Sequence, residues 1–222
     1  MVRYLAALLD VMGKDESDPE RSDLCSQIMS ISRRFLRSSE IAEAAASELS
    51  ADSFEVIHIR SFISEFAGKS FASSGGRLSI DIAEIPDSTV LSSADMLRYI
   101  FLTYLRKYLN TFPKGKLKFI FGCRCEENST IIRLEYTEND ENAFSSAKLT
   151  IPELTDKYPD ELCMILSARI GAECSVSEKS LELRIAPQEF RGDVTLKSKM
   201  ITPTGGDFSP YDIMLADYDN RS

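Results

Sequence analysis

The sequence predicts an α+β fold: a helical hairpin followed by a two-layer α/β sandwich, in which a mixed sheet carries helices on one face. Two patterns support this prediction. Apolar residues recur at alternating steps of four and three through residues 24–49, which is typical of a helix with a narrow apolar seam. Alternating apolar and polar residues at 77–82, 117–125 and 130–138 are typical of strands, and helical patterns lie among them.

The helical part is predicted within residues 1–53. A short helix at 3–12 is followed by a polar, turn-rich break at 13–23 and then by the long seam helix. A seam this narrow suits a coiled coil or an antiparallel hairpin, and the short first helix cannot cover it, so we expect a homodimer through a four-helix bundle. The seam consists of Leu24, Ile28, Ile31, Phe35, Ala42, Ala45 and Leu49.

The sandwich is predicted within residues 54–187. A helical pattern over 54–71 ends at the SSGG of 73–76, and a second helix is expected from a cap at Ser92 or Ser93 to about Leu109. The elements that follow are a hairpin of 117–125 with 130–138, a helix at 156–170, and a strand pair formed by ECSVSE and SLELRIA. This order favours a sheet of about five strands with helices on one face.

Composition indicates a folded, acidic protein. Hydrophobic residues make up 43% of the 222 residues, which is enough to build a core, and the formal net charge is −9. Because an acidic protein repels phosphate backbones, we expect no nucleic-acid binding. No apolar run approaches the ~18–20 residues that span a membrane, and no signal-peptide cleavage motif is present, so we expect a cytoplasmic protein without a membrane segment.

Cysteine and histidine do not occur in a metal-binding pattern. The sequence has five cysteines without a CxxC motif, and His58 is its only histidine. Zinc sites and disulfide frameworks use these residue types in clusters at characteristic spacings, so we expect neither. His58 is expected to be an ordinary linker histidine.

The order of elements and several local matches resemble the core of a sensor histidine kinase, in which dimerisation helices precede an ATPase-type catalytic domain. Asp95, Leu97 and Arg98 match the start of the family's nucleotide-binding helix. Gly171 matches the glycine between the last helix and the terminal hairpin. The resemblance covers about residues 1–187, and the helix at 24–49 corresponds to the second dimerisation helix.

The family's nucleotide-binding residues are replaced in this chain. Thr103 and Lys107 stand where the family has two Asn, the second of which helps to hold magnesium. A lysine cannot ligate Mg²⁺ and can only pair with a phosphate as a point charge. Glu138 stands where the family's Asp contacts adenine, but its loop at 138–142 has no glycine. The phosphate-wrapping loop corresponds to KYPDEL at 157–162, also without glycine.

The resemblance therefore implies a two-component phosphorelay module that has lost ATP-dependent autophosphorylation, with no catalytic residue, metal or cofactor. It would act as a homodimer that binds a partner, the receiver domain of a response regulator. Arg33, Arg34 and Arg37 form a basic patch that is either a solvated face or the docking site for that partner. Three alternatives stay open: an active kinase that uses ATP and Mg²⁺ in a divergent pocket, a phosphotransferase of the helical-hairpin type, and an unrelated α/β protein.

Residues 188–222 are expected to be a linker that leads into a further domain. YDIMLADYDNRS resembles the first strand of a receiver domain, with an apolar run at 213–216 followed by Asp217 and Asp219. The alternative is an ordinary disordered tail.

Overall fold

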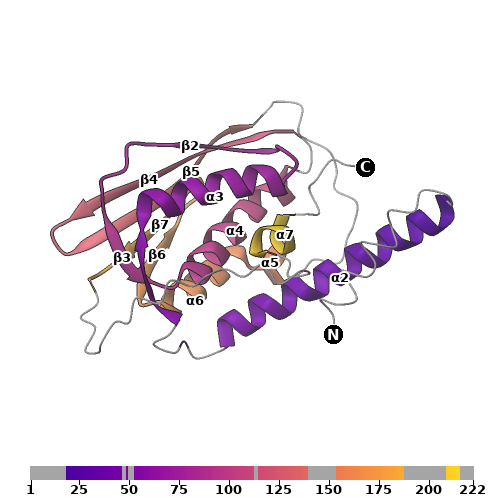
Figure 1. Ribbon diagram of the computed structural model, residues 1–222, viewed down its shortest axis with the longest axis horizontal. Coiled ribbons are helices and arrows are strands. Elements are labelled where there is room, and N and C mark those ends of the chain that lie inside the picture. Colours follow the sequence, from indigo (N-terminus) through magenta and orange to yellow (C-terminus); the bar gives the residue numbers. More distant parts are fainter. Residues whose placement is uncertain are drawn as a thin grey trace.

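A long helix leads into a two-layer α/β sandwich (Figure 1). The predicted α+β class, with helices on one face of a five-stranded mixed sheet, is confirmed. No helix in the described part of the chain is long and apolar enough to span a membrane. The computed structural model describes residues 19–46, 49, 53–112, 115–139, 154–187 and 209–215.

The sheet has the strand order β2-β4-β5-β7-β6. β2 and β4 are parallel, and the other neighbours are antiparallel. Side chains alternate between the helical layer and the outer face, as the period of two in the sequence predicts. The strands are β2 (Leu78–Ile82), β4 (Leu117–Glu126), β5 (Ser129–Asn139), β6 (Ala172–Val176) and β7 (Ser180–Ile185).

Three helices cover one face of this sheet: α3 (Ile59–Ser73), α4 (Ala94–Thr111) and α6 (Pro159–Arg169). α4 begins where the sequence predicts, because the Ser93 side chain accepts a hydrogen bond from the Met96 backbone N–H at 3.5 Å. Between the layers, the ring of Phe101 lies 5.8 Å from that of Phe66 and 4.7 Å from that of Phe121. Edge-to-face aromatic packing of this kind makes a large share of the core.

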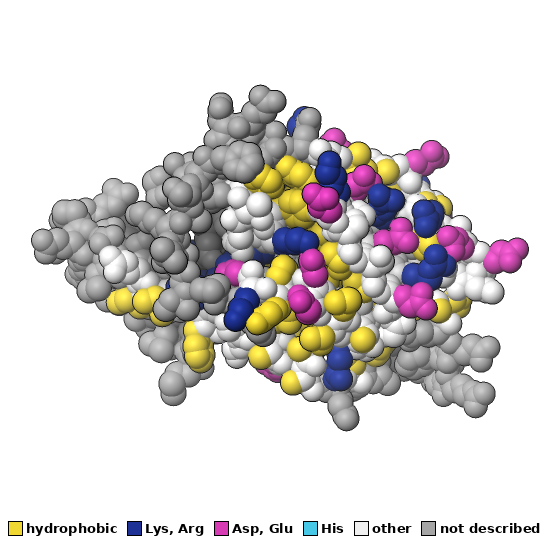
Figure 2. Space-filling model, turned by 180° about the vertical axis from the view of Figure 1, so that it is seen from behind, with side chains coloured by type: hydrophobic (Ala, Val, Ile, Leu, Met, Phe, Trp, Pro, Cys, Tyr) yellow, Lys and Arg dark blue, Asp and Glu magenta, His cyan; other side chains and the backbone are white. Residues whose placement is uncertain are grey.

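The outer face of the sheet carries interspersed charges (Figure 2). Arg133 lies 3.0 Å from Glu135, and Arg124 lies 3.6 Å from Glu182. Exposed pairs of this kind contribute about 0–1 kcal/mol each to stability. Because the signs alternate, this face presents neither a basic nor an acidic field to a partner.

The helical segment is α2 (Pro19–Ala46), of 28 residues, whose first part extends past the sandwich (Figure 1). Its buried side carries Leu36, Arg37 and Ile41. The seam residues of its first half face away from the domain: Ile28, Ile31 and Phe35 are 37%, 64% and 60% exposed. The short helix expected at 3–12 and the Leu24 side chain lie outside the described residues.

Two predicted helices are only partly correct. The segment expected to be helical from residue 54 begins instead with β1 (Glu55–His58), which pairs with β3 (Thr89–Ser92) in a separate two-stranded sheet. β-Branched residues favour this strand, and Ile57 is its buried position. The helix expected at 156–170 is divided into α5 (Leu154–Lys157) and α6, because Pro159 restricts the residue before it and cannot continue a helix.

The strand expected at 213–216 is not formed by residues 213–215, which belong to helix α7 (Pro210–Leu215). The Ser209 and Asp212 side chains explain this difference. Ser209 Oγ donates to Asp212 Oδ2 at 2.7 Å, and the Asp212 backbone N–H donates to Ser209 Oγ at 3.3 Å. With Pro210 at the first helical position, this is a helix-capping arrangement that an apolar run of four residues cannot override.

Candidate functional site

The candidate site lies on the face of α4 that meets α5 and α6. Thr103 and Lys107, four residues apart, fall one turn apart on this helix, as their spacing predicts. Thr103 is fully buried, and its hydroxyl has no hydrogen-bond partner among the described residues. Lys107 is partly exposed at the edge of the helix, with 26% of its side chain accessible. Of these two residues, only Lys107 carries a charge.

The Lys107 ammonium forms an ion pair with a carboxylate of the same chain. Lys107 Nζ donates to both carboxylate oxygens of Asp160, at 2.8 Å and 2.9 Å. Asp160 lies in the first turn of α6, directly after Pro159. The amino end of a helix carries partial positive charge, which favours an anion there. Asp160 therefore takes the place, between a lysine and a helix amino end, that a phosphate group would find favourable.

A second carboxylate ties α5 to the same helix. Asp156 Oδ1 accepts from Arg106 Nε at 2.9 Å and from Asn110 Nδ2 at 2.6 Å. The Arg106 side chain is 4% exposed and that of Asp156 21%. Breaking a buried pair by removing one partner costs about 3–5 kcal/mol. Both short helices are therefore attached to α4 by a carboxylate, α5 by Asp156 and α6 by Asp160.

Aromatic side chains fill the space between the end of α4 and β5. The rings of Tyr108 and Tyr136 are stacked with centroids 4.5 Å apart, and the Phe112 ring also stacks with that of Tyr136, at 6.0 Å. The hydroxyl of Tyr108 lies 3.0 Å from that of Tyr104 and 2.5 Å from the carbonyl oxygen of Glu178. Burial raises the pKa of both Tyr104 and Tyr108, so both phenols are neutral at physiological pH.

Glu138, the proposed adenine contact, belongs to β5, where its backbone is in register with Lys118. Its side chain and residues 140–142 lie outside the described part of the chain. Its role at the site stays a prediction.

The three arginines of the predicted docking patch are not equivalent. Arg37 is fully buried, and its guanidinium donates to the carbonyl oxygen of Ile213 at 2.6 Å. It is therefore a contact within the chain and does not belong to an exposed patch, because α7 covers it. Arg33 and Arg34 are partly exposed. No sequence pattern distinguishes Arg37 from its neighbours, since its acceptor lies 176 positions away.

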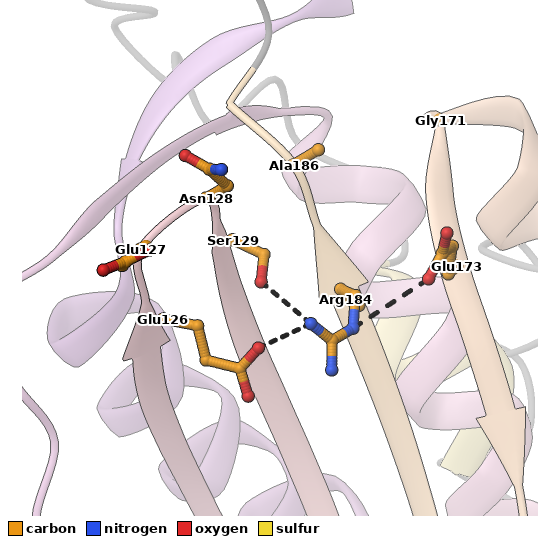
Figure 3. A pocket seen from close by; sticks show the side chains of 8 residues that line it. All are labelled: Glu126, Glu127, Asn128, Ser129, Gly171, Glu173, Arg184 and Ala186. Carbon is orange, nitrogen blue, oxygen red and sulfur yellow. Dashed lines mark hydrogen bonds and ion pairs between the residues drawn. The ribbon is translucent and has the colours of Figure 1, made fainter.

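A cavity of about 460 Å³ lies elsewhere, where the β4–β5 hairpin meets the ends of β6 and β7 (Figure 3). Arg184, the only cationic side chain among its described lining residues, donates to Glu126 at 2.6 Å and to Ser129 at 3.2 Å, and lies 3.9 Å from Glu173. Among the described residues, no group of Asp, Glu, Cys and His is placed to hold a metal ion. Arg184 is therefore engaged by carboxylates of the cavity itself, and none of the described lining residues belongs to α4.

His58 lies at the end of β1 and directly precedes α3. Its side chain is exposed. This position agrees with an ordinary linker histidine.

Comparisons with known proteins identify the fold. No family model matches this chain, and no curated protein matches it. Among solved structures, the Acinetobacter baumannii histidine kinase AdeS is 9% identical, covers 85% of this chain and 94% of its own, and gives a TM-score of 0.54. Full-length ShkA in complex with AMPPNP is 12% identical over 85% of this chain and 44% of its own, with a TM-score of 0.57. The chain has the fold of a histidine kinase core, as its sequence resemblance implies.

Proposed function

We propose that this chain is a kinase-like module of a two-component phosphorelay that does not phosphorylate itself from ATP and acts by binding other proteins. The observation that carries this proposal is the pair between Lys107 and Asp160. An ammonium cannot ligate Mg²⁺, and here it is neutralised by a carboxylate of the chain. A triphosphate approaching α4 would therefore meet Lys107 and Arg106 each already paired with a carboxylate.

The size of this effect decides between a weakened and a lost ATP site. Two opposite unit charges 4 Å apart attract by about 4 kcal/mol near a protein surface, and the pairing of Lys107 with Asp160 withdraws this attraction from an incoming phosphate. A loss of that size converts a micromolar dissociation constant into one near a millimolar. The buried Arg106–Asp156 pair opposes any opening of the α5–α6 segment that would move the carboxylates away.

Calorimetric titration with ATP and Mg²⁺ tests the proposal. We expect no saturable binding below millimolar concentration and no incorporation of phosphate from labelled ATP, because the metal ligand is absent and the lysine is paired. Asp160→Asn removes one carboxylate and serves as the matched variant, in which any residual affinity should rise. A micromolar dissociation constant for the parent chain that disappears in Glu138→Ala would instead establish the active-kinase alternative.

The proposed assembly is a homodimer through α2. Ile28, Ile31 and Phe35 form an exposed apolar stripe on α2, whose first part extends past the sandwich (Figure 1). Matching stripes on two copies would bury one another, as in a helical bundle. The test of this assembly is given in the Discussion.

The proposed partner is the receiver domain of a response regulator, whose phosphorylation pocket is acidic. Arg33 and Arg34 are partly exposed on α2, whereas Arg37 is buried. The phosphotransferase alternative requires a histidine in the helical segment, and the sequence has none before His58.

A further inference from the structure

The short helix α7 lies in a groove formed by α2, α3 and α4 (Figure 1). It is separated in sequence from the end of β7, yet four of its six residues are at most 2% exposed. These residues are Tyr211, Ile213, Met214 and Leu215. A helix this short is not stable alone in water, where about 12–15 residues are needed, so the groove must hold it in its helical form.

Tyr211 is the aromatic anchor of α7. Its ring lies 5.7 Å from the ring of Phe66, and the ammonium of Lys69 lies 5.7 Å from its centroid. Its hydroxyl makes no hydrogen bond of normal geometry within the described residues, although Arg98 lies near it. Burial raises the pKa of Tyr211 to about 12 although the positive charge of Arg98 opposes the rise, so the side chain packs as a neutral apolar group.

Polar contacts fix both ends of α7. At its start, Asp212 accepts from Ser73 of α3 at 3.0 Å while it caps the helix with Ser209. At its end, two guanidinium groups reach successive backbone carbonyls. Arg37 donates to the Ile213 oxygen at 2.6 Å, and Arg106 donates to the Met214 oxygen at 3.0 Å.

These two arginines explain why the groove selects the end of a helix. The last carbonyls of a helix have no partner within it and carry partial negative charge, so they accept well from cations. Arg37 and Arg106 are 0% and 3% exposed, and buried guanidinium groups require such acceptors. Arg37 belongs to α2 and Arg106 to α4, so α7 connects the helical segment to the sandwich.

We propose that the α2–α3–α4 groove is a recognition site for a short helix with an aromatic anchor, and that residues 209–215 occupy it as a releasable latch holding α2 on the sandwich. Arg106 also bonds to Asp156, so release of the latch would remove one of the contacts of the guanidinium that holds α5. The inference goes beyond the proposed function and holds equally for an active kinase, because it rests only on the contacts of α7.

The first test uses substitutions in the full chain that should release α7 from the groove. Tyr211→Asp places a charge against Phe66 and should release the latch, whereas Tyr211→Phe should retain it because the hydroxyl makes no hydrogen bond of normal geometry within the described residues. By hydrogen–deuterium exchange, we expect amides of α7 and of α2 around Leu36 and Ile41 to exchange at least tenfold faster in Tyr211→Asp than in the parent. Asp212→Ala, which removes the cap and the Ser73 contact, should change exchange in the same direction and serves if Tyr211→Asp does not fold.

A labelled peptide then tests recognition directly. The peptide FSPYDIMLA, residues 208–216, should bind Tyr211→Asp at least tenfold more tightly than the parent, measured by fluorescence anisotropy, because the parent groove is filled by its own α7. Adding Arg37→Ala to Tyr211→Asp should weaken this binding at least tenfold. Unchanged exchange in both release variants, or equal peptide binding by parent and Tyr211→Asp, would overturn the latch. A result that contradicts the latch does not change the result expected from the ATP titration, so the latch and the proposed function are tested independently.

Discussion

Replacing Phe101 by alanine should lower the free energy of unfolding by about 3–5 kcal/mol. Phe101 is fully buried on α4, and its ring meets those of Phe66 and Phe121 between the helical layer and the sheet. Truncation leaves a cavity that rigid neighbours on two layers cannot collapse into, which adds to the lost transfer free energy. Urea unfolding followed by circular dichroism measures the change.

Phe71→Ala is the matched control for this prediction. Phe71 lies on α3 and is 54% exposed, so its loss should change the unfolding free energy by no more than about 0.5 kcal/mol. Equal effects of the two substitutions would show that the layer contact at Phe101 is not the centre of the core.

Replacing Ile31 by aspartate should convert a dimer into monomers. Ile31 is 64% exposed on the isolated chain and lies between Ile28 and Phe35 on the apolar stripe of α2. In the proposed bundle a carboxylate at this position would be buried without a partner, which costs several kcal/mol. Light scattering coupled to size-exclusion chromatography, at tens of micromolar protein, gives the mass directly.

Ser30→Asp controls for the added charge, because Ser30 is an exposed neighbour that lies off the stripe. We expect this variant and the parent to be dimers. A monomeric parent at this concentration would contradict the proposed assembly, whatever the behaviour of Ile31→Asp.

Elements with a strong local period were predicted well. The alternation at 77–82 predicted β2. Two long alternating runs with a short polar stretch between them predicted the β4–β5 hairpin. The cap at Ser93 gave the start of α4. The pair β1 and β3 was missed because each strand has only four residues, too few for a period to be read, and the first is followed at once by the helical pattern of α3.

The placement of Thr103 and Lys107 on one helix is confirmed, whereas their role in a site stays a prediction. Thr103 and Lys107 were identified by their correspondence to family positions, and the structure places them one turn apart on α4. The pairing of Lys107 with Asp160 was not predicted. Asp160 belongs to the KYPDEL stretch, which was interpreted from the sequence only as a glycine-free counterpart of the phosphate-wrapping loop. A carboxylate directly after a proline is a signal for the start of a helix, but its pairing with a lysine 53 positions away is not written in any local pattern.

By itself, the sequence predicted the longer strands and helices of the sandwich, because periodicity and capping residues are local properties. Only the tertiary structure decided which side of α2 is buried and where the C-terminal segment lies. The capping residues Ser209 and Asp212 signal the helix α7 locally, but its helical form persists only in the groove between α2, α3 and α4. Likewise, Arg37 resembles its exposed neighbours in sequence and becomes a buried contact because the Ile213 carbonyl, 176 positions away, offers its guanidinium an acceptor.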